Sequence, residues 1–561
     1  MRKKAHGLVT VRAISGTHVV FLALNMKERA AKGLMGFAIQ RADLTENETI
    51  WLRGNKTFTS IRPSTGIEDA SSHDHPFQAF QWADYSVKPG YRYRYRVIPM
   101  YERPGALTEG AATSLRIDSE PLSGRKHDVH FNRGAIASQA FAKHFPGKTL
   151  DEAGPPAYAW LARDLLPALL GFIAKARDAH YSLHAAFYEL AWLDVLTAFK
   201  AAAQAGADVK IIYHAKDDDT GSENEEKIDE AGIGTLCVPR RNAKLMHNKF
   251  IVLSKKGKPV SVWTGSTNLS RNALHGQLNV GHALHDPHIA QSFLEYWKTL
   301  EADPLSAKIK DWAEACNTLP PEDDSDLLTP VFSPHRGRRV FDWWIDLADS
   351  ANKPLFMTFP FGIVQDFRPV FDKNDGILRF GMLDKYVNGG NIASRAKAIE
   401  EIGRIRRYPN IGMALGSRLF VDWIDGWYKE PRAIGVNVNW VHTKFMLIDP
   451  LGAKPVTLTG SANWSEASVN TNDENMVLIR GDKRVADIYF SEFMRIFAHH
   501  RFRESVGRYI EKYGAEAFKH WRPQDLHEDW RKWVPPHFQA GSEHDIRRRY
   551  FALEDSSSRS E

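Results

Sequence analysis

Short apolar runs separated by turn residues predict β structure over the first 120 residues of the chain. These runs are Leu8–Ile14, His18–Leu24, Gly36–Arg41 and Thr49–Leu52. The segment Tyr91–Val97 alternates strictly, with tyrosine on one face and arginine on the other. Because successive side chains of a strand point to opposite faces, one face of this segment is expected to be buried and the other solvated. The pattern predicts a β-sandwich domain over residues 1–120.

From residue 125 onward the pattern changes to helices that alternate with strands. The first block predicts strands over Tyr181–Phe187 and Val209–Tyr213, with helices over Leu165–Arg177 and Leu193–Ala203. The acidic stretch Asp217–Asp229 is expected to be a solvated loop. Alternating strands and helices are typical of a parallel-rich sheet with helices on its faces, and we assign residues 125–317 to this first α/β unit.

A proline-containing linker over residues 318–330 precedes a second unit with the same order of elements. The pattern in this unit predicts helices over Arg339–Ala351 and Val485–Ala498, with strands over Pro354–Phe359 and Ile377–Leu383. We assign residues 331–500 to it. Residues 501–561 are predicted to be a helical, basic and aromatic tail that packs back on the catalytic body, with a disordered end at Ser556–Glu561.

One polar motif occurs twice, and each matched residue of the second copy follows its counterpart by 195 positions. The first copy reads His247-Asn248-Lys249-Phe250 and then Thr264-Gly265-Ser266-Thr267-Asn268. The second copy reads His442-Thr443-Lys444-Phe445 and then Thr459-Gly460-Ser461-Ala462-Asn463. This agreement indicates an internal duplication, and what it duplicates is a site.

Each copy presents an imidazole, an ammonium, a hydroxyl and a carboxamide from the ends of two buried strands. The histidine and the lysine lie two residues apart on an extended segment, so their side chains share a face. Two copies brought together would place two imidazoles and two ammonium groups around one pocket. Such a set suits a phosphodiester, because one histidine can attack phosphorus, the other can protonate the leaving oxygen, and lysine and asparagine can hold the charged oxygens.

These motifs resemble the signature of the phospholipase D superfamily, which is His-x-Lys-x4-Asp followed by Gly-Ser-x-Asn. The resemblance covers about residues 125 to 500. It implies an α/β fold of two tandem α-β-α sandwich halves related by a pseudo-twofold axis, with one active site shared between them. It also implies a covalent phosphohistidine intermediate, with no metal and no other cofactor. The residues that would be catalytic are His247, His442, Lys249 and Lys444, and those that would bind the substrate phosphate are Ser266, Asn268, Ser461 and Asn463.

A second resemblance concerns the first domain. The turn Lys88-Pro89-Gly90 leads directly into the alternating strand, and this arrangement resembles a fibronectin type III or immunoglobulin-like sandwich. The resemblance implies an accessory domain for recognition or docking, in front of the two catalytic halves.

The two motif copies depart from the superfamily pattern in different ways. The motif's Asp is present in the second copy as Asp449, whereas the first copy has Ser254. Glu474 resembles the family's histidine-orienting carboxylate, but the corresponding first-copy stretch Gln277-Leu278-Asn279 contains no acid. We therefore expect Asp449 and Glu474 to orient His442 and raise its basicity, with no local carboxylate for His247. The identity of the nucleophile stays open: analogy favours His247, and the nearby carboxylates favour His442.

Composition limits the kinds of binding partner and the cellular compartment that we expect for the chain. Hydrophobic residues make up 43% of the chain and charged residues 25%, which is typical of soluble globular proteins. No run approaches the ~20 apolar residues of a membrane span, and no convincing signal peptide begins the chain, so we expect a cytoplasmic enzyme. The two cysteines, Cys237 and Cys316, form no CxxC motif, which argues against a zinc–thiolate site. Because both motif copies lie in one chain, we expect a monomer.

Three functions remain open from the sequence. The first is a phospholipase D-type hydrolysis of a glycerophospholipid to phosphatidate. The second is a nuclease, or another nucleic-acid phosphodiesterase, with the same mechanism. The third is a catalytically degenerate binding protein, which the departures in the first copy suggest. The residues around the motifs are mixed, because Arg240, Arg241 and Lys244 favour nucleic acid, whereas Trp440 and Trp464 favour a lipid interface.

Overall fold

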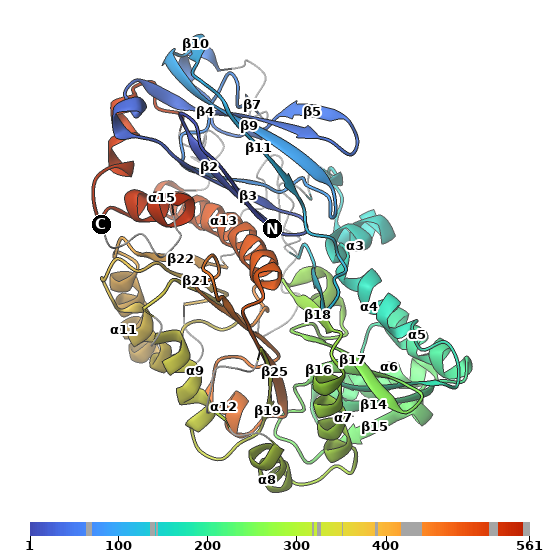
Figure 1. Cartoon of the computed structure of the whole chain (residues 1–561). Coiled ribbons are helices and arrows are strands. Elements are labelled where there is room, and N and C mark those ends of the chain that lie inside the picture. The colour runs from blue at the N-terminus through green and yellow to red at the C-terminus, as the bar shows by residue number, and fades with distance from the viewer. Residues whose placement is uncertain are drawn as a thin grey trace.

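The chain forms a β domain and two α/β halves that share one large apolar core (Figure 1). The computed structural model describes residues 1–62, 70–134, 141, 144–316, 319–321, 327–349, 352–386, 391–416, 440–514 and 525–553. The disordered end that we expect at Ser556–Glu561 lies outside the described residues.

Two antiparallel sheets make up the β domain. One has the strand order β1 (Arg2–Ala5), β2 (Thr10–Ser15), β3 (Val20–Asn25) and β8 (Gln81–Asp84). The other has the order β10 (Ala106–Glu109), β9 (Arg92–Arg103), β4 (Leu34–Asp43) and β5 (Glu48–Trp51), and β11 (Thr113–Asp118) also pairs with β9. Side chains from both sheets are buried in one core, among them Val11, Leu22, Phe37 and Val97. The predicted β-sandwich is confirmed.

Strand β9 shows the alternation that the sequence predicts. Tyr93 and Tyr95 are buried in the sandwich, whereas Arg92 and Arg94 are exposed. The Tyr93 hydroxyl accepts a hydrogen bond of 2.8 Å from the backbone N–H of Lys88, which closes the corner before the strand. A tyrosine that bonds back to the chain just upstream of its own strand is typical of immunoglobulin-like sandwiches.

Each α/β half contains a seven-stranded mixed sheet, and the two sheets have equivalent strand orders. The first sheet runs β12 (His127–Phe131), β18 (Val280–Leu284), β17 (Lys258–Gly265), β16 (Lys249–Lys255), β13 (Tyr181–Phe187), β14 (Asp208–His214) and β15 (Cys237–Arg240). The second runs β19 (Leu328–Ser333), β25 (Glu474–Arg480), β24 (Val456–Gly460), β23 (Phe445–Ile448), β20 (Leu355–Phe359), β21 (Arg379–Leu383) and β22 (Ile411–Leu415). In each sheet the last three strands are parallel to one another and the other pairs are antiparallel. The duplication therefore includes the whole sheet.

Helices cover both faces of each sheet. In the first half, α4 (Leu165–Ile173), α5 (Leu193–Gln204) and α6 (Asp219–Ala231) pack on one face, and α7 (Pro287–Glu301) and α8 (Ser306–Cys316) on the other. In the second half, α9 (Arg339–Asp349), α10 (Arg368–Phe371) and α11 (Ile392–Ile405) oppose α13 (Lys483–Tyr513) and α15 (Glu543–Leu553). The short helices α2 (Leu150–Ala153), α3 (Pro155–Ala162) and α12 (Glu466–Asn470) complete the halves. The predicted fold of two α-β-α sandwiches after a β-sandwich is confirmed.

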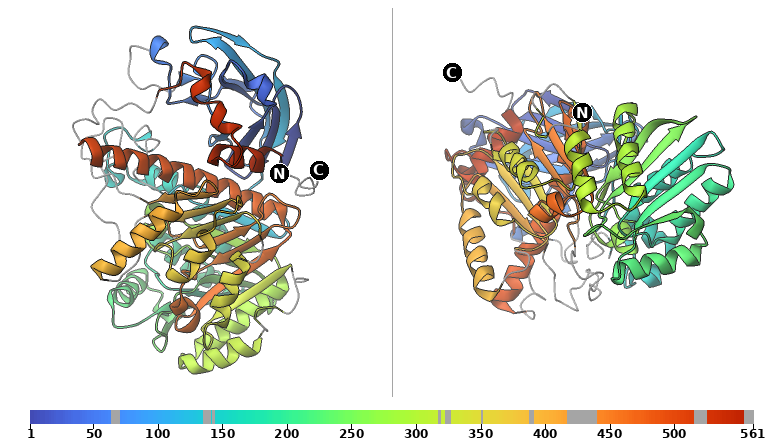
Figure 2. Two further views of the ribbon diagram at one scale, coloured as in Figure 1. Left: turned by 90° about the vertical axis from the view of Figure 1, so that its left-hand side faces the viewer. Right: turned by 90° about the horizontal axis from the view of Figure 1, so that it is seen from below.

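Helix α13 joins the second half to the β domain. It lies between that domain and the second sheet (Figure 2) and continues past the expected boundary at residue 500. Phe490 of α13 contacts Phe356 of β20 and Phe21 of β3 in edge-on packing, with ring centroids 5.4 and 5.5 Å apart. In the tail, Phe551 lies 5.1 Å from Phe21, and Trp533 is buried in the core of the β domain. The tail therefore packs on the β domain as well as on the second half.

Two local predictions need correction. The acidic stretch Asp217–Asp229 is mostly helix α6, because the Asp218 side chain accepts the Gly221 N–H at 2.9 Å and caps the helix. Asn224 and Ile228 of this helix are buried at helical spacing, a period that the many acidic residues conceal. In addition, β19 begins at Leu328, inside the segment expected to be a linker.

Candidate active site

The two motif histidines stand at the contact between the halves, each at the start of the central strand of its sheet. His247 precedes β16 and His442 precedes β23. Each backbone pairs with the opposite half: the His247 N–H donates to the Asp473 carbonyl at 2.9 Å, and the His442 N–H donates to the Leu278 carbonyl at 3.2 Å. Two parallel β-bridges next to the histidines also join the halves. One pairs Met246 with Asp473, and the other pairs Val441 with Leu278. The backbone thus brings both motif copies to one place.

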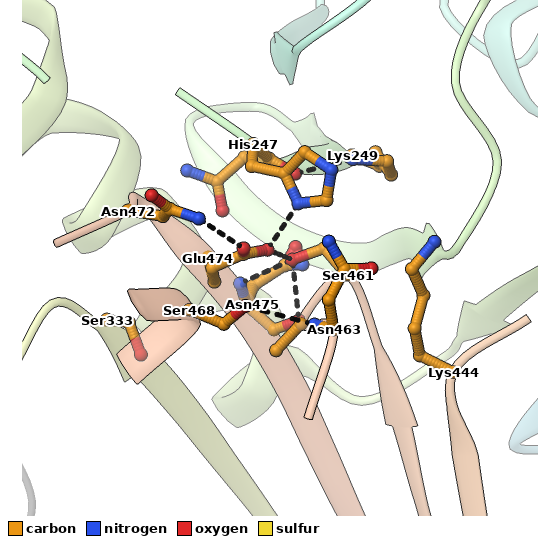
Figure 3. A network of polar contacts seen from close by, with 12 residues as sticks. His247, Lys249, Ser333, Lys444, Ser461, Asn463, Ser468, Asn472, Glu474 and Asn475 are labelled. Carbon is orange, nitrogen blue, oxygen red and sulfur yellow. Dashed lines mark hydrogen bonds and ion pairs between the residues drawn. The ribbon is translucent and has the colours of Figure 1, made fainter. Parts of the chain in front are cut away.

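Glu474 contacts the histidine of the opposite half. Its Oε2 lies 2.8 Å from Nδ1 of His247 (Figure 3). The same oxygen accepts the Ser461 hydroxyl at 2.6 Å, and Oε1 accepts the Asn472 amide at 3.2 Å. Because a carboxylate can only accept, Nδ1 of His247 carries the proton and Nε2 is left with its lone pair. The expectation that Glu474 orients His442 is wrong, because β25 places it across the interface.

His442 has a neutral partner in the equivalent position. Its Nδ1 lies 2.9 Å from Oδ1 of Asn279. The Asn279 amide nitrogen donates to the Ala273 carbonyl at 2.9 Å, and the Ser266 hydroxyl donates to Oδ1 at 2.8 Å, so the amide orientation is fixed. Asn279 is 195 positions before Glu474. The residue that replaces the carboxylate in the first copy is therefore Asn279, the last residue of the stretch that the sequence shows to lack an acid.

Asp449, the second residue expected to orient His442, lies elsewhere. It follows the last residue of β23, whereas His442 precedes the first, so the whole strand separates them. The carboxylate of Asp449 lies 3.9 Å from the ammonium of Lys353, and its backbone φ is 48°. This expectation is also wrong. Its first-copy counterpart Ser254 lies near the same distant end of β16, so the difference between Asp and Ser leaves the histidines untouched.

The two motif lysines are buried beside the histidines. Lys249 donates from Nζ to the His247 carbonyl at 2.7 Å, and Lys444 donates to the His442 carbonyl at 2.6 Å. Figure 3 shows Lys444 extending from the second half toward the space near His247. An ammonium has three N–H donors, so each lysine keeps donors for a further acceptor. Burial lowers the pKa of Lys249 to about 8 and lowers the pKa of Lys444 well below its ordinary value.

The motif serines brace the histidine partners. Ser461 gives its hydroxyl proton to Glu474 and accepts the Asn475 N–H at 2.9 Å, and Ser266 likewise serves Asn279 and the Val280 N–H. Since a hydroxyl has one proton to donate, neither serine can also donate to a phosphate in this arrangement. The preceding glycines are required, because a Cβ on Gly265 or Gly460 would come within 2.2 Å of a strand carbonyl.

Each motif asparagine has a side-chain oxygen that no described residue contacts through a hydrogen bond. Oδ1 of Asn268 and Oδ1 of Asn463 are buried without a hydrogen-bond partner in the described part of the chain. Buried polar atoms without partners are uncommon and suggest that a ligand or water completes them. Phosphate oxygens and amide oxygens both accept, so the group that could hold a phosphate is the amide Nδ2 of each asparagine. We retain both asparagines, and not the serines, as candidate phosphate-binding residues.

Burial and the two lysines keep the histidine rings neutral. Burial lowers the pKa of His247 to about 4, although the negative charge of Glu474 opposes this. Burial also lowers the pKa of His442 well below its ordinary value, and the positive charges of Lys444 and Lys249 add to the effect. Burial opposes ionisation of Glu474, yet its contact with His247, the charge of Lys249 and the hydrogen bond from Ser461 hold its pKa below the ordinary value. A carboxylate therefore faces one neutral imidazole, and an amide faces the other.

Sequence reasoning missed Tyr188 and Glu189, which follow β13. The Tyr188 ring lies edge-on to the His247 ring at 5.2 Å and under the Lys249 ammonium at 5.6 Å. The Glu189 carboxylate accepts the Ser270 hydroxyl at 2.5 Å, and its charge raises the pKa of both motif lysines against the stronger effect of burial. Their position along the chain could have indicated them, because they directly follow Phe187, the strand residue that pairs with Lys249.

The residues that flank the motifs do not form the surfaces that the sequence suggested. Arg240 is fully buried in ion pairs, and Arg241 pairs with Glu225. Trp440 is nearly buried under the Arg503 guanidinium, and Trp464 is fully buried with its indole N–H on the Thr358 carbonyl. Lys244, the third basic residue before the first motif, is exposed. Arg240, Trp440 and Trp464 are buried, so they contribute neither to a basic track nor to an aromatic lipid surface.

No described set of three or more His, Cys, Asp or Glu side chains is grouped closely enough to hold a metal ion. Within the same described residues, no helix combines the length and the apolar character needed to cross a membrane. The positive charge at the site comes from Lys249 and Lys444.

Comparisons with known proteins agree with this arrangement. The family model described as "Cardiolipin synthase, PLD-like domain" matches residues 171–300 and 417–497, which include both histidine–lysine motifs. The chain carries a phospholipase D-like domain. Enzymes with domains of this type cleave or transfer phosphodiesters.

Several solved structures are similar to the phospholipase D-like chain at low sequence identity. Phosphatidylserine synthase from Haemophilus influenzae is 13% identical, with a TM-score of 0.43, over 64% of this chain and 92% of that one. Yeast tyrosyl-DNA phosphodiesterase is 10% identical, with a TM-score of 0.31, over 56% of this chain and 87% of that one. NucT from Helicobacter pylori is 19% identical, with a TM-score of 0.23, over 31% of this chain and 96% of that one. No curated protein is similar enough in sequence to count as a match. These neighbours carry no information on the substrate.

Proposed function

We propose that the chain is a metal-independent phosphodiesterase that hydrolyses a glycerophospholipid to phosphatidate through a covalent phosphohistidine. The observation that carries the proposal is the cross-half pairing at the site. His247 is held by the carboxylate of Glu474 at 2.8 Å, and His442 is held by the amide of Asn279 at 2.9 Å. Two histidines with different partners can perform two different tasks.

In the first step, Nε2 of His247 attacks phosphorus and a P–N bond forms. The P–O bond to the headgroup alcohol breaks, and the leaving oxygen takes a proton from Nε2 of His442. Lys249, Lys444 and the two motif asparagines hold the non-bridging oxygens as charge develops on them. Phosphorylation makes the His247 ring cationic, and the adjacent Glu474 carboxylate stabilises that charge.

In the second step, a water molecule attacks the phosphorus. His442, now neutral, takes a proton from this water, the P–N bond breaks, and its electron pair returns to Nε2 of His247. The products are phosphatidate and the free alcohol. His442 thereby regains the proton that it donated, and the enzyme returns to its starting state.

The different partners support His247 as the nucleophile. Glu474 stabilises positive charge on its ring, which a phosphorylated imidazole carries. His442 faces neutral Asn279. Burial, together with the positive charges of Lys444 and Lys249, lowers its pKa well below the ordinary value. The negative charge of a bound phosphodiester favours protonation of His442, and a histidine of low intrinsic pKa then gives up its proton readily.

The electrostatics of the site favour a substrate with a single phosphodiester. Glu189 brings a second carboxylate close to the motif lysines, beside Glu474. Such a charge repels further phosphates but tolerates a zwitterionic headgroup. Two of the basic residues before the first motif, Arg240 and Arg241, pair with acidic side chains, so they add little attraction for a polynucleotide. These observations favour the phospholipid over nucleic acid.

The intact side chains argue against a degenerate binding protein. Both histidines, both lysines and both motif asparagines are present, and both histidines have a ring partner. The differences in the first copy are Ser254, which is remote, and Asn279, which replaces a charge without leaving the ring unpaired.

Two experiments test the proposal. The first compares choline release from phosphatidylcholine vesicles with nicking of single- and double-stranded DNA. Choline release without nicking is expected; DNA nicking that His442→Ala abolishes, with inert vesicles, would overturn the assignment of the substrate.

The second experiment uses bis-p-nitrophenyl phosphate, whose leaving group needs little acid assistance. His247→Ala and His442→Ala should each lose steady-state turnover. His442→Ala should still release one equivalent of p-nitrophenol and retain a phosphoryl adduct on His247, visible as added mass on its peptide, whereas His247→Ala should form none. An adduct on His442 would reverse the assignment of the nucleophile, and near-normal turnover by either variant would refute the shared site.

A further inference from the structure

A buried ion pair crosses the interface between the halves just beside the Glu474–His247 contact. Arg240, the last residue of β15, places its Nε 2.9 Å from Oδ2 of Asp473, and both side chains are completely buried. The Arg240 guanidinium also lies 2.8 Å from Oδ1 of Asp303 and donates to the Pro304 carbonyl. Arg240 therefore anchors Asp473 to the first half through a network that includes no motif residue.

Asp473 is tied to the first motif by its backbone as well. Its N–H donates to the Leu245 carbonyl at 2.9 Å, and its carbonyl accepts the His247 N–H at 2.9 Å. The next residue, Glu474, holds the His247 ring. The main chain and the side chain of Asp473 thus fix the point from which Glu474 reaches the nucleophile.

The pseudo-symmetry supplies an internal comparison. On the His442 side, Leu278 occupies the place of Asp473 and forms the same backbone contacts, to the Trp440 carbonyl at 2.7 Å and from the His442 N–H at 3.2 Å. The strand registers place Gly416 where the other half has Arg240. An apolar residue thus suffices for this backbone geometry. Of these two equivalent positions, the ion pair occurs at Asp473, which precedes the carboxylate Glu474. It does not occur at Leu278, which precedes the neutral Asn279.

The charges explain this difference. Asp473 and Glu474 are consecutive and completely or almost completely buried. Two neighbouring buried carboxylates resist ionising together unless a cation balances them. Burial raises the pKa of Asp473 to about 6, and the nearby Glu474 charge adds to this, while Arg240 opposes it. Without the guanidinium, the adjacent acids would share a proton, and Glu474 could no longer hold the Nδ1 proton of His247 as a full carboxylate.

We propose that Arg240 is a positioning residue, which pairs with Asp473 and thereby keeps Glu474 ionised and aimed at His247. The inference rests on the proposed function, in which His247 is the nucleophile. Folding alone does not account for the pair, because a buried ion pair is often no more stabilising than apolar side chains of similar size. Arg240 acts through Asp473 and Glu474, and it touches no reacting atom.

The test compares Arg240→Met, Asp473→Leu and the double variant with the wild type on bis-p-nitrophenyl phosphate. Arg240→Met leaves Asp473 without its cation beside Glu474, so we expect kcat to fall by about 100-fold with KM nearly unchanged. The acid limb of its pH profile should move to higher pH, because the pKa of Glu474 rises. Arg240→Lys should keep part of the activity by retaining the charge.

The double variant Arg240→Met/Asp473→Leu copies the uncharged arrangement around Leu278. It should fold, and its kcat should be at least about tenfold higher than that of Arg240→Met. The acid limb of its pH profile should lie close to that of the wild type, because Glu474 no longer has an acidic neighbour. A loss in Arg240→Met that is equal at all pH values and is not recovered in the double variant would overturn the proposal, as would a wild-type rate in Arg240→Met.

A second measurement separates this inference from the proposed function. The p-nitrophenol burst and the adduct on His247 are followed in the wild type and in Arg240→Met. Slower adduct formation in the variant supports the positioning role, whereas the same rate in both proteins refutes it. A wild-type protein without any adduct refutes the phosphohistidine mechanism instead.

Discussion

Oε2 of Glu474 lies 2.8 Å from Nδ1 of His247, although the two residues belong to different halves of the chain. The reciprocal contact joins Asn279 to His442. Each histidine therefore depends on a residue that the other half supplies, and neither motif copy contains its own ring partner. Under the proposed function, this exchange makes the site depend on both halves, and the difference between an acid and an amide gives the two histidines different tasks.

The charge of Glu474 should be essential. Glu474→Gln keeps the size of the side chain but removes the carboxylate that fixes the His247 tautomer and stabilises its positive charge. We expect kcat on bis-p-nitrophenyl phosphate to fall by about 10³- to 10⁴-fold with a small change in KM. Asp449→Asn is the matched control, because Asp449 lies beyond the far end of β23 and Asn tolerates its left-handed backbone. Equal losses in the two variants would contradict the assignment.

The serines give a test that separates bracing from phosphate binding. Ser461 donates to Glu474 at 2.6 Å, and this hydrogen bond helps to lower the pKa of that carboxyl. Ser461→Ala should therefore reduce kcat and move the acid limb to higher pH, with KM nearly unchanged. Ser266→Ala, which removes a hydrogen bond to neutral Asn279, should not move that limb. A rise in KM at constant kcat in either variant would instead indicate direct contact with the phosphate.

The sequence predicted most of the fold because the local patterns were strong. Tyr181–Phe187 is a strand with the predicted bounds, and the 195-residue repeat located both histidine–lysine motifs. The pairing of side chains was not predictable in the same way. Glu474 is near His442 along the chain, and only the parallel bridges between the halves show that it contacts His247 instead. The 195-residue offset aligns Asn279 with Glu474, and the contacts of these two side chains with the histidines of the opposite halves agree with that alignment.

Lys249 should set the alkaline limb of the pH profile. Burial lowers its pKa to about 8, so the ammonium loses its proton as the pH rises through that value, and its hold on the phosphate weakens. We expect kcat/KM, which reports the free enzyme, to fall above about pH 8. In Lys249→Arg the guanidinium stays charged, and the limb should move to higher pH even if the rate is lower. Lys255→Arg, at the exposed end of the same strand, is the control. An unchanged limb in Lys249→Arg would exclude Lys249 as its origin.

Activity should not require a metal ion. The two motif lysines supply positive charge for the phosphate, and the described residues include no cluster suited to hold a metal. Turnover of bis-p-nitrophenyl phosphate should be unchanged after dialysis against EDTA. A loss that added Mg²⁺ or Zn²⁺ reverses would show that a metal supplies charge to the transition state, contrary to the proposed mechanism.

Glu189 should influence the choice of substrate. Its carboxylate accepts the Ser270 hydroxyl, two residues beyond Asn268, and its charge acts on both motif lysines. A fixed negative charge there should oppose substrates with several phosphates more than a zwitterionic phospholipid, because the second phosphate adds repulsion. Glu189→Gln removes the charge and keeps the shape. We expect this variant to gain activity on a single-stranded oligonucleotide relative to phosphatidylcholine, and the gain should shrink as salt screens the repulsion. Glu225→Gln changes the net charge equally at an exposed site paired with Arg241 and serves as the control. The same ratio of activities in Glu189→Gln, Glu225→Gln and the wild type would show that Glu189 takes no part in selecting the substrate.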